Sequence, residues 1–331
     1  MLRWTVALAF GLLTLAEASK FYAIVAVTDP DEATGGATAI SKIVTGFMSL
    51  NDANKEPHVT WHGSDDIVSG LTWSQRGMEL SAMDRFNDYL ITVCDRTGVV
   101  FRIMDQTKAV PWVILPSENG TDASKGFAAE WLTHKDGVLY AGSHGSDPAT
   151  KWIKTVSKKG EVQHVDWSDN YAKVAEKLAV ADPDVKHEAV QWSPKFSKWY
   201  MLPRIGNGER KLVVASEDFQ TIDVSEAIGG PNTDAAFSAF QFVPGTEDRV
   251  LVALETATAE NNQETRASVL EVMLEEPPAE EDDTPTTKIT VGVLMPSAKA
   301  ETGGEAAGRM EGLEVYQLRL GESTSGEPGC P

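Results

Sequence analysis

A single polar residue followed at once by a short apolar stretch recurs five times along this chain of 331 residues. These residues are Ser81, Glu130, Glu188, Ser238 and Glu311, at intervals of 49, 58, 50 and 73 residues. In most repeats a turn and a second β-prone stretch follow, whereas helical periodicity is scarce along the chain. A period near 50 with several strands per repeat is typical of a propeller blade, so the sequence predicts an all-β, five-bladed β-propeller.

The five repeated residues also predict a metal site. Because a propeller closes on itself, equivalent residues of its innermost strands converge on the central axis. Three carboxylates and two hydroxyls would form a ring of hard oxygen donors there, which is the donor set that Ca²⁺ prefers. The alternative is that each residue is an ordinary polar residue that caps a turn at a strand edge. Five such residues in register favour a central Ca²⁺ site.

The N-terminal residues have the features of a signal peptide over residues 1–18. Arg3 precedes an apolar run over 5–16, and the small residues Ala18 and Ser19 follow. The run is short for a bilayer span of roughly 20 residues, so a retained anchor is the second choice and we expect no stable membrane insertion after cleavage. The sequon that begins at Asn119 agrees with a secretory location, either outside the cell or in the lumen of the ER or Golgi.

Residues 19–320 are expected to form the propeller, with a helix over 170–178, and residues 321–331 a flexible tail rich in Gly, Ser and Pro. Cys94 and Cys330 are the two cysteines. A secretory compartment would allow them to pair, but Cys330 is the penultimate residue of the tail, so the disulfide is not favoured.

The net charge of −20 argues against nucleic-acid binding, because an acidic surface repels the phosphate backbone. Part of the excess is local, since residues 275–286 hold six carboxylates and three prolines. Such a run buries too little apolar surface to offset its ordering entropy, so we expect a solvated loop over 275–286, within an acidic, low-complexity insertion over 275–308. Calcium buffering by this run is the less favoured alternative.

Several blocks of the chain, in order, resemble the soluble calcium-activated nucleotidase (apyrase) family. They are RGMELS (76–81), CDRTGVVFRI (94–103), KAVPWVIL (108–115), KGFAAEWL (125–132), HEAVQWSPKFSKWYMLPR (187–204), AFSAFQFVPGTEDRVLVAL (236–254) and MEGLEV (310–315). The resemblance covers residues 21 to 318 and implies a five-bladed propeller with an axial Ca²⁺. It also implies hydrolysis of nucleoside diphosphates such as UDP and GDP, with ADP and triphosphates used less or variably.

The resemblance places calcium ligands at Ser81, Glu130, Glu188, Ser238 and Glu311, the same five residues that the spacing selects. Three positions depart from the family pattern. Ala82 stands where the family usually has Asp, and Cys94 replaces the first carboxylate of an Asp pair. The early Asp-Leu-Asp is here Asp29, Pro30 and Asp31. These departures leave the ring intact but bear on nucleotide affinity and rate.

Four carboxylates are candidates for the chemistry, since phosphoanhydride hydrolysis needs a positioned water and a group that takes its proton. Asp29 and Asp31 follow an apolar strand, although a turn around Pro30 would also explain them. Glu79 precedes Ser81 by two residues, and Asp95 opens an Asp-Arg-Thr-Gly hairpin that turn chemistry alone would also account for.

Arg76, Arg96 and Arg204 are candidates for phosphate binding, because a guanidinium offers paired donors in a fixed fork. Arg204 is favoured among them, since it follows a strand where the family has a basic residue. Trp131, Trp152 and Trp192 could stack on a base, but core packing is the more common role of such residues.

Two other functions stay open. A non-catalytic propeller could use calcium only as a staple and bind a ligand or partner at its mouth. A calcium-dependent esterase or lactonase would need a His-based proton relay, and no His pair occurs at the repeated positions. The preferred base, the use of triphosphates, the final compartment and formation of a homodimer are not decided by the sequence.

Overall fold

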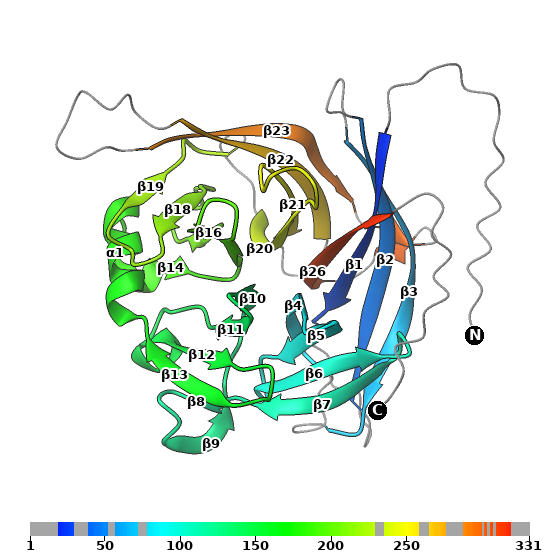
Figure 1. Ribbon diagram of the computed structural model, residues 1–331, viewed down its shortest axis with the longest axis vertical. Coiled ribbons are helices and arrows are strands. Elements are labelled where there is room, and N and C mark those ends of the chain that lie inside the picture. Colours follow the sequence, from blue (N-terminus) through cyan, green and yellow to red (C-terminus); the bar gives the residue numbers. More distant parts are fainter. Residues whose placement is uncertain are drawn as a thin grey trace.

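The computed structural model describes residues 19–29, 39–51, 57–71, 78–228, 235–257, 265–275, 287–299, 301–302, 305–306 and 309–318. Within these ranges the chain is almost entirely β-structure, arranged as sheets around a common centre (Figure 1). This arrangement confirms the expected all-β fold of the propeller type.

The largest sheet has eight strands in the order β26-β1-β2-β3-β7-β6-β5-β4. Its strands are β1 (Ser19–Thr28), β2 (Ala39–Asn51), β3 (Pro57–Ser69), β4 (Leu80–Phe86), β5 (Tyr89–Cys94), β6 (Val99–Met104), β7 (Lys108–Ile114) and β26 (Met310–Leu318). All its pairings are antiparallel except β3 with β7, which are joined in parallel through the single pair Val68 and Lys108. The sheet is thus two four-stranded antiparallel groups that meet at one bridge.

Three further sheets have four strands each. The first contains β10 (Trp131–Lys135), β11 (Val138–Gly142), β12 (Trp152–Val156) and β13 (Val162–Asp166). The second contains β15 (Val190–Ser193), β16 (Lys198–Met201), β18 (Val213–Ser216) and β19 (Ile222–Val224). The third contains β20 (Ala235–Phe242), β21 (Val250–Ala257), β22 (Thr265–Glu275) and β23 (Lys288–Lys299).

Short elements complete the described chain. They are β8 (Pro116–Ser117), β9 (Asp122–Gly126), β14 (Val185–Lys186), β17 (Arg204–Ile205), β24 (Glu301–Thr302), β25 (Glu305–Ala306), the 3₁₀ turns η1 (Pro148–Lys151) and η2 (Asp182–Asp184), and α1 (Ser168–Leu178). None of the described helices has the length and apolarity that crossing a bilayer requires.

Tight turns set the register of the innermost hairpins. Asn87 and Asp88 join β4 to β5 with φ of 52° and 67°, and Asp136 and Gly137 join β10 to β11 with φ of 51° and 75°. Two consecutive positive φ angles are the requirement of a type I′ turn, whose twist matches that of the flanking strands. Local turn chemistry therefore fixes which residues of β4 and β10 face the centre.

The helix α1 confirms the expectation for residues 170–178 and covers one face of the aromatic core. It buries Tyr171, Val174, Ala175 and Leu178, and ends at Ala179, which has a left-handed φ of 57°. Between the β10 and β15 sheets the core contains Trp131, Trp167, Tyr171, Trp192, Trp199 and Phe219. Trp131 and Trp192 are therefore core residues, while Trp152 lies on the third strand of its sheet.

Part of the expected acidic insertion over 275–308 is a β-strand. Residues 288–299 form β23, the fourth strand of its sheet, and pair with β22 from Lys288 opposite Glu275 to Lys299 opposite Arg266. Ile289 of this strand is buried, and Val291 packs against the same apolar cluster. Residues 276–286, the signal segment 1–18, the tail 321–331 and Cys330 lie outside the described residues.

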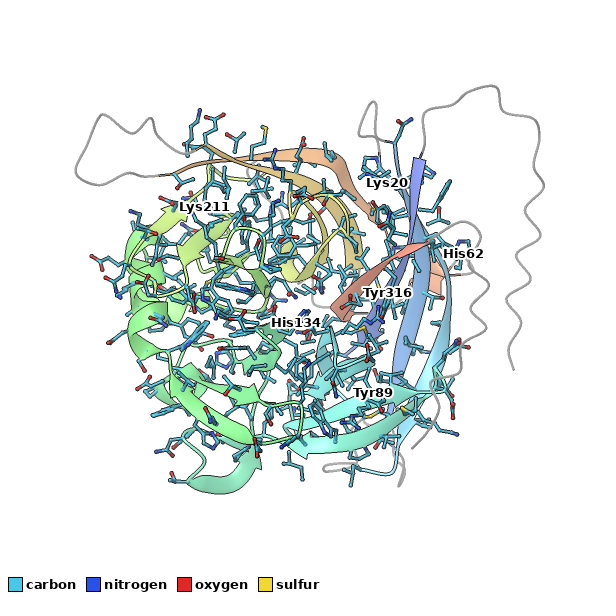
Figure 2. All side chains as sticks on the ribbon, viewed as in Figure 1. Lys20, His62, Tyr89, His134, Lys211 and Tyr316 are labelled. Carbon is cyan, nitrogen blue, oxygen red and sulfur yellow. The ribbon has the colours of Figure 1, made fainter. Side chains whose placement is uncertain are left out.

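The innermost strands β4, β10, β15, β20 and β26 contact one another in cyclic order around the centre. Three or four residues beyond the repeated positions, polar side chains link neighbouring strands. His134 Nδ1 on β10 is hydrogen-bonded to Asp84 Oδ2 on β4 at 3.0 Å, and Gln241 on β20 donates to Glu314 on β26 at 3.3 Å. Figure 2 shows His134 near the middle of the ring and His62 at its outer edge.

The His134–Asp84 pair predicts a pH-dependent stability. The hydrogen bond to Asp84 raises the pKa of His134 above 6.5, and burial raises the pKa of Asp84. The stabilisation from His134 is fully present below pH 6.5 and is lost as the pH rises through its raised pKa, whereas the raised pKa of Asp84 contributes fully only below the ordinary Asp value of 3.8. We expect the unfolding temperature to fall between about pH 6 and 8, and His134→Phe to flatten that change. An equal slope in the variant would contradict this role.

Candidate metal and nucleotide site

Bulges in the innermost strands coincide with three of the five repeated residues. In the β4–β5 ladder the pairing passes from Leu80 to Ala82 and omits Ser81. The β20–β21 ladder omits Ser238, and the β1–β26 ladder omits Glu311, in the same way. The extra residue of a β-bulge leaves the ladder, which redirects its side chain. The fold therefore singles out these three residues from their neighbours.

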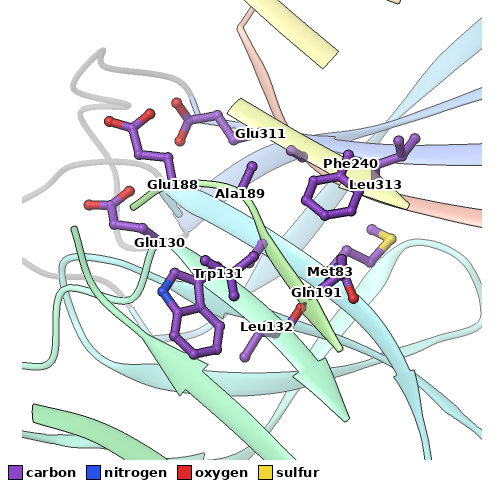
Figure 3. Close-up of a pocket in the computed structure, with 13 residues that line it drawn as sticks. Met83, Glu130, Trp131, Leu132, Glu188, Ala189, Gln191, Phe240, Glu311 and Leu313 are labelled. Atoms are coloured by element: carbon purple, nitrogen blue, oxygen red, sulfur yellow. Dashed lines mark hydrogen bonds between the residues drawn. The ribbon is translucent and has the colours of Figure 1, made fainter. Parts of the chain in front are cut away.

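Glu130 and Glu188 lie at the same end of the central channel, but neither is a bulge residue, because each stands just before its strand. The backbone N–H of Glu130 donates to Gly142 O at 2.8 Å, which extends the β10–β11 ladder by one residue. Glu188 precedes Ala189, whose carbonyl accepts from Leu202 N at 2.9 Å. Figure 3 shows Glu130, Glu188 and Glu311 grouped at one end of a cavity, with Phe240 and Leu313 farther along.

The cavity has a volume of about 10 Å³ and is lined by all three of these glutamates. That is close to the space of one water-sized particle. Ser81 Oγ is completely buried and has no hydrogen-bond partner within the described part of the chain, whereas Ser238 Oγ donates to Met310 O at 2.9 Å. A buried oxygen without a partner is costly, and a cation is one way to satisfy it.

The three glutamates carry like charges and repel one another. Burial and the nearby Glu188 and Glu311 raise the pKa of Glu130 well above its usual value. Burial likewise raises the pKa of Glu311 to about 7, and that of Glu188 is also raised. Among the residues that the structure describes, no three His, Cys, Asp or Glu side chains lie close enough to hold a metal ion as they stand. The donor types fit Ca²⁺, and a divalent cation would relieve this repulsion.

A second group of carboxylates lies beside the ring. Asp29 and Glu79 are buried, and together with burial itself they raise the pKa of Asp95 to about 7. The backbone holds this group together, since Asp95 N donates to Glu79 O at 3.0 Å. Asp95 Oδ1 is buried and has no hydrogen-bond partner. The structure thus brings three of the four carboxylate candidates together, while Asp31 lies outside the described residues.

Two of the arginine candidates are paired with carboxylates of the site. Arg96 Nε lies 2.7 Å from Glu79 Oε2, and Arg204 Nε lies 2.7 Å from Glu188 Oε2. Arg76 lies outside the described residues. Arg204 begins the short strand β17, which pairs with β14, and β14 ends two residues before Glu188. The guanidinium that follows the β16 strand is therefore beside the ring.

Arg309 belongs to the site but was missed by the sequence reasoning. Its guanidinium lies 3.2 Å from Asp29 Oδ2 and 2.5 Å from Glu311 Oε1. Arg309 precedes Glu311 by two residues, as Glu79 precedes Ser81. Its place in the site comes from the pairing of β1 with β26, which is a contact between the two ends of the chain.

The departures from the family pattern can be located. Ala82 lines the cavity and packs in the core, so no oxygen stands at that position. Cys94 is buried against the same apolar core as Leu80 and Met83. His187 stacks on Tyr171 with ring centres 3.9 Å apart, and burial lowers its pKa to about 3, which agrees with a structural role.

Comparison with known proteins gives a consistent result. The family model described as Apyrase matches residues 28–280. An apyrase of Cimex lectularius is 33% identical over 268 residues, which cover 72% of this chain and 73% of that protein. Soluble calcium-activated nucleotidase 1 of Mus musculus is 35% identical over 243 residues, covering 66% of this chain and 60% of that protein.

Among solved structures, the periplasmic gluconolactonase of Pseudomonas aeruginosa aligns at a TM-score of 0.38 and 8% identity, over 89% of this chain and 99% of that one. Likeness at this level carries no argument about function. The family match covers most of the chain, including four of the five repeated residues. The chain belongs to the apyrase family.

Proposed function

We propose that the chain is a calcium-dependent nucleotidase that hydrolyses nucleoside diphosphates, UDP and GDP first, to the monophosphate and phosphate. ADP and triphosphates are further candidate substrates. The observation that carries the proposal is the grouping of Glu188 and Glu311, which are buried, with the half-buried Glu130 around one cavity, beside a second group of carboxylates and arginines. The apyrase and nucleotidase names of the relatives support the substrate class.

In this proposal the Ca²⁺ ligands are Ser81, Glu130, Glu188, Ser238 and Glu311. When bound, the cation supplies positive charge that stabilises negative charge on the transferred phosphoryl group. Asp29, Asp31, Glu79 and Asp95 orient the attacking water and accept its proton. Arg76, Arg96 and Arg204 bind phosphate oxygens.

We further infer that the eight-stranded sheet is two blades, which makes five with the three four-stranded sheets. The single parallel bridge between β3 and β7 supports this division. The Asn119 sequon supports passage through the secretory pathway, since Asn119 is exposed in the turn between β8 and β9.

One assay separates this proposal from its alternatives. Purified protein is offered UDP, GDP, ADP, ATP and an aryl ester, with Ca²⁺ or Mg²⁺, and phosphate and phenol release are measured. Phosphate from UDP that requires Ca²⁺ supports the proposal. Cleavage of the ester alone would indicate an esterase, and no product from any substrate despite bound Ca²⁺ would indicate a binding propeller.

Replacing Arg204 by Ala should raise the KM for UDP about tenfold with a smaller fall in kcat, measured at saturating Ca²⁺. The guanidinium is oriented by Glu188 and is one-fifth exposed, so it can contact a phosphate in both the ground state and the transition state. Arg102 stacks on Tyr89 and Trp112 on the third strand from the centre of its blade, so Arg102→Ala is the matched control. Equal KM values for the two variants would remove Arg204 from the phosphate site.

A further inference from the structure

Arg309 lies between Asp29, a candidate for the acid/base chemistry, and Glu311, a candidate calcium ligand. One terminal nitrogen, Nη1, lies 3.2 Å from Asp29 Oδ2, and the other, Nη2, lies 2.5 Å from Glu311 Oε1. Its backbone carbonyl accepts from Asp29 N at 3.0 Å. Arg309 therefore has both its main chain and its side chain on Asp29, and extends from there to the ring.

The contact with Glu311 differs from that with Asp29. Glu311 Oε1 is buried and lacks a hydrogen bond of acceptable geometry, although Nη2 is close to it. The contact is thus an ion pair in which Glu311 Oε1 can still accept a hydrogen bond or bind a cation. Arg96 and Arg204 instead pair with Glu79 and Glu188, one carboxylate each. Arg309 has the geometry of a bridge.

The guanidinium also acts on the charges around it. Its positive charge lowers the pKa values of Asp95, Glu188 and Glu311 against the effect of burial. A Ca²⁺ ion on the ring would draw on the same Glu311 carboxylate and would be repelled by the same guanidinium. The ion pair and calcium binding are consequently linked, and each weakens the other.

We propose that Arg309 is a positioning residue that couples the axial Ca²⁺ site to Asp29 and to the substrate phosphate. This inference rests on the proposed function. With the Glu311 carboxylate engaged by a bound Ca²⁺, the guanidinium would stay anchored to Asp29 through Nη1, and Nη2 would be free to contact a phosphate oxygen of the nucleoside diphosphate. Calcium binding would thereby make the guanidinium available to the phosphate. Because the ion pair with Glu311 must be given up, calcium would bind more weakly than it would without Arg309.

The test compares calcium affinity with turnover in the full-length protein. Calorimetric titration with Ca²⁺ should show that Arg309→Gln binds the ion about tenfold more tightly than wild type, because a competing cation is gone. Its kcat on UDP should fall about tenfold at saturating Ca²⁺. A residue with a merely structural role would not tighten calcium binding. Lys195 pairs with Glu247 away from the ring, so Lys195→Gln is the control with the same change of charge and should match wild type in both measurements.

A second variant keeps the test decisive if the first fails to fold. Arg309→Lys retains the charge but cannot span two carboxylates, so its calcium affinity should stay within about twofold of wild type while kcat falls about tenfold. Calcium affinity in a folded Arg309→Gln that equals or falls below wild type, or an unchanged kcat in Arg309→Lys, would overturn the coupling. If wild type binds calcium but releases no phosphate from any nucleotide, the proposed function fails, and the titration still decides whether Arg309 competes with calcium.

Discussion

Replacing Asp29 by Asn should lower the kcat for UDP by about a hundredfold or more, with calcium affinity almost unchanged. The substitution keeps the size of the side chain but removes a buried charge, so Asn can neither polarise the attacking water nor hold Arg309 by an ion pair. The defect should persist at any calcium concentration, because Asp29 lies beside the ring and not in it.

The control for this prediction is Asp105→Asn, which makes the same change at an exposed carboxylate paired with Lys108. Its turnover should match wild type. Because Asp29 is buried with its partner, a lower unfolding temperature is expected for Asp29→Asn, and turnover is compared well below it. If both Asp29→Asn and Asp31→Asn keep nearly normal turnover, Glu79 and Asp95 inherit the acid/base role.

Replacing Asp95 by Asn should also lower kcat, by about a hundredfold, and should change the pH profile. Burial and the neighbouring Asp29 and Glu79 raise the pKa of Asp95 to about 7. A carboxyl that titrates near neutrality is suited to accept a proton from water, since its basic form is present while its affinity for the proton is high. Wild-type kcat/KM should therefore rise with pH through about 7.

In Asp95→Asn that rising limb should be absent, because no group with this pKa remains to be deprotonated. The measurement is kcat/KM for UDP between about pH 5.5 and 8.5 at saturating Ca²⁺. A rising limb that survives unchanged in the variant would assign the titration to another group, with Glu311, whose pKa is also about 7, as the first alternative.

The sequence predicted the innermost strands well because their signals are local. Turn residues such as Asn87 and Asp136 fix the hairpins, and four of the five repeated polar residues lie within two residues of the start of their inner strand, with Ser238 three residues into β20. The 288–299 strand was missed because its order depends on pairing with β22, which is a tertiary contact. The composition of the sequence around the acidic run gives no information about the pairing with β22.

The candidate site could also be predicted only in part. Spacing identified five residues, three of which are now seen to be the extra residues of bulges, a detail that no local pattern specified. Arg309 was missed because its importance comes from the pairing of β1 with β26, which joins Asp29 to a residue nearly three hundred positions away. Ends of the chain that meet in one sheet leave no signal in local sequence.

The most direct test of the account is UDP hydrolysis measured across buffered free Ca²⁺ in wild type and in Glu130→Gln. Burial and the neighbouring carboxylates disfavour the charge of Glu130, and a bound cation would relieve that effect. Loss of the charge should therefore shift the half-maximal Ca²⁺ concentration upward by about tenfold or more, with activity largely recovered at high Ca²⁺. Wild type should release phosphate with Ca²⁺ and none with a chelator. Full activity of wild type in the chelator, or identical calcium curves for the two proteins, would contradict a calcium-dependent nucleotidase with its metal on this ring.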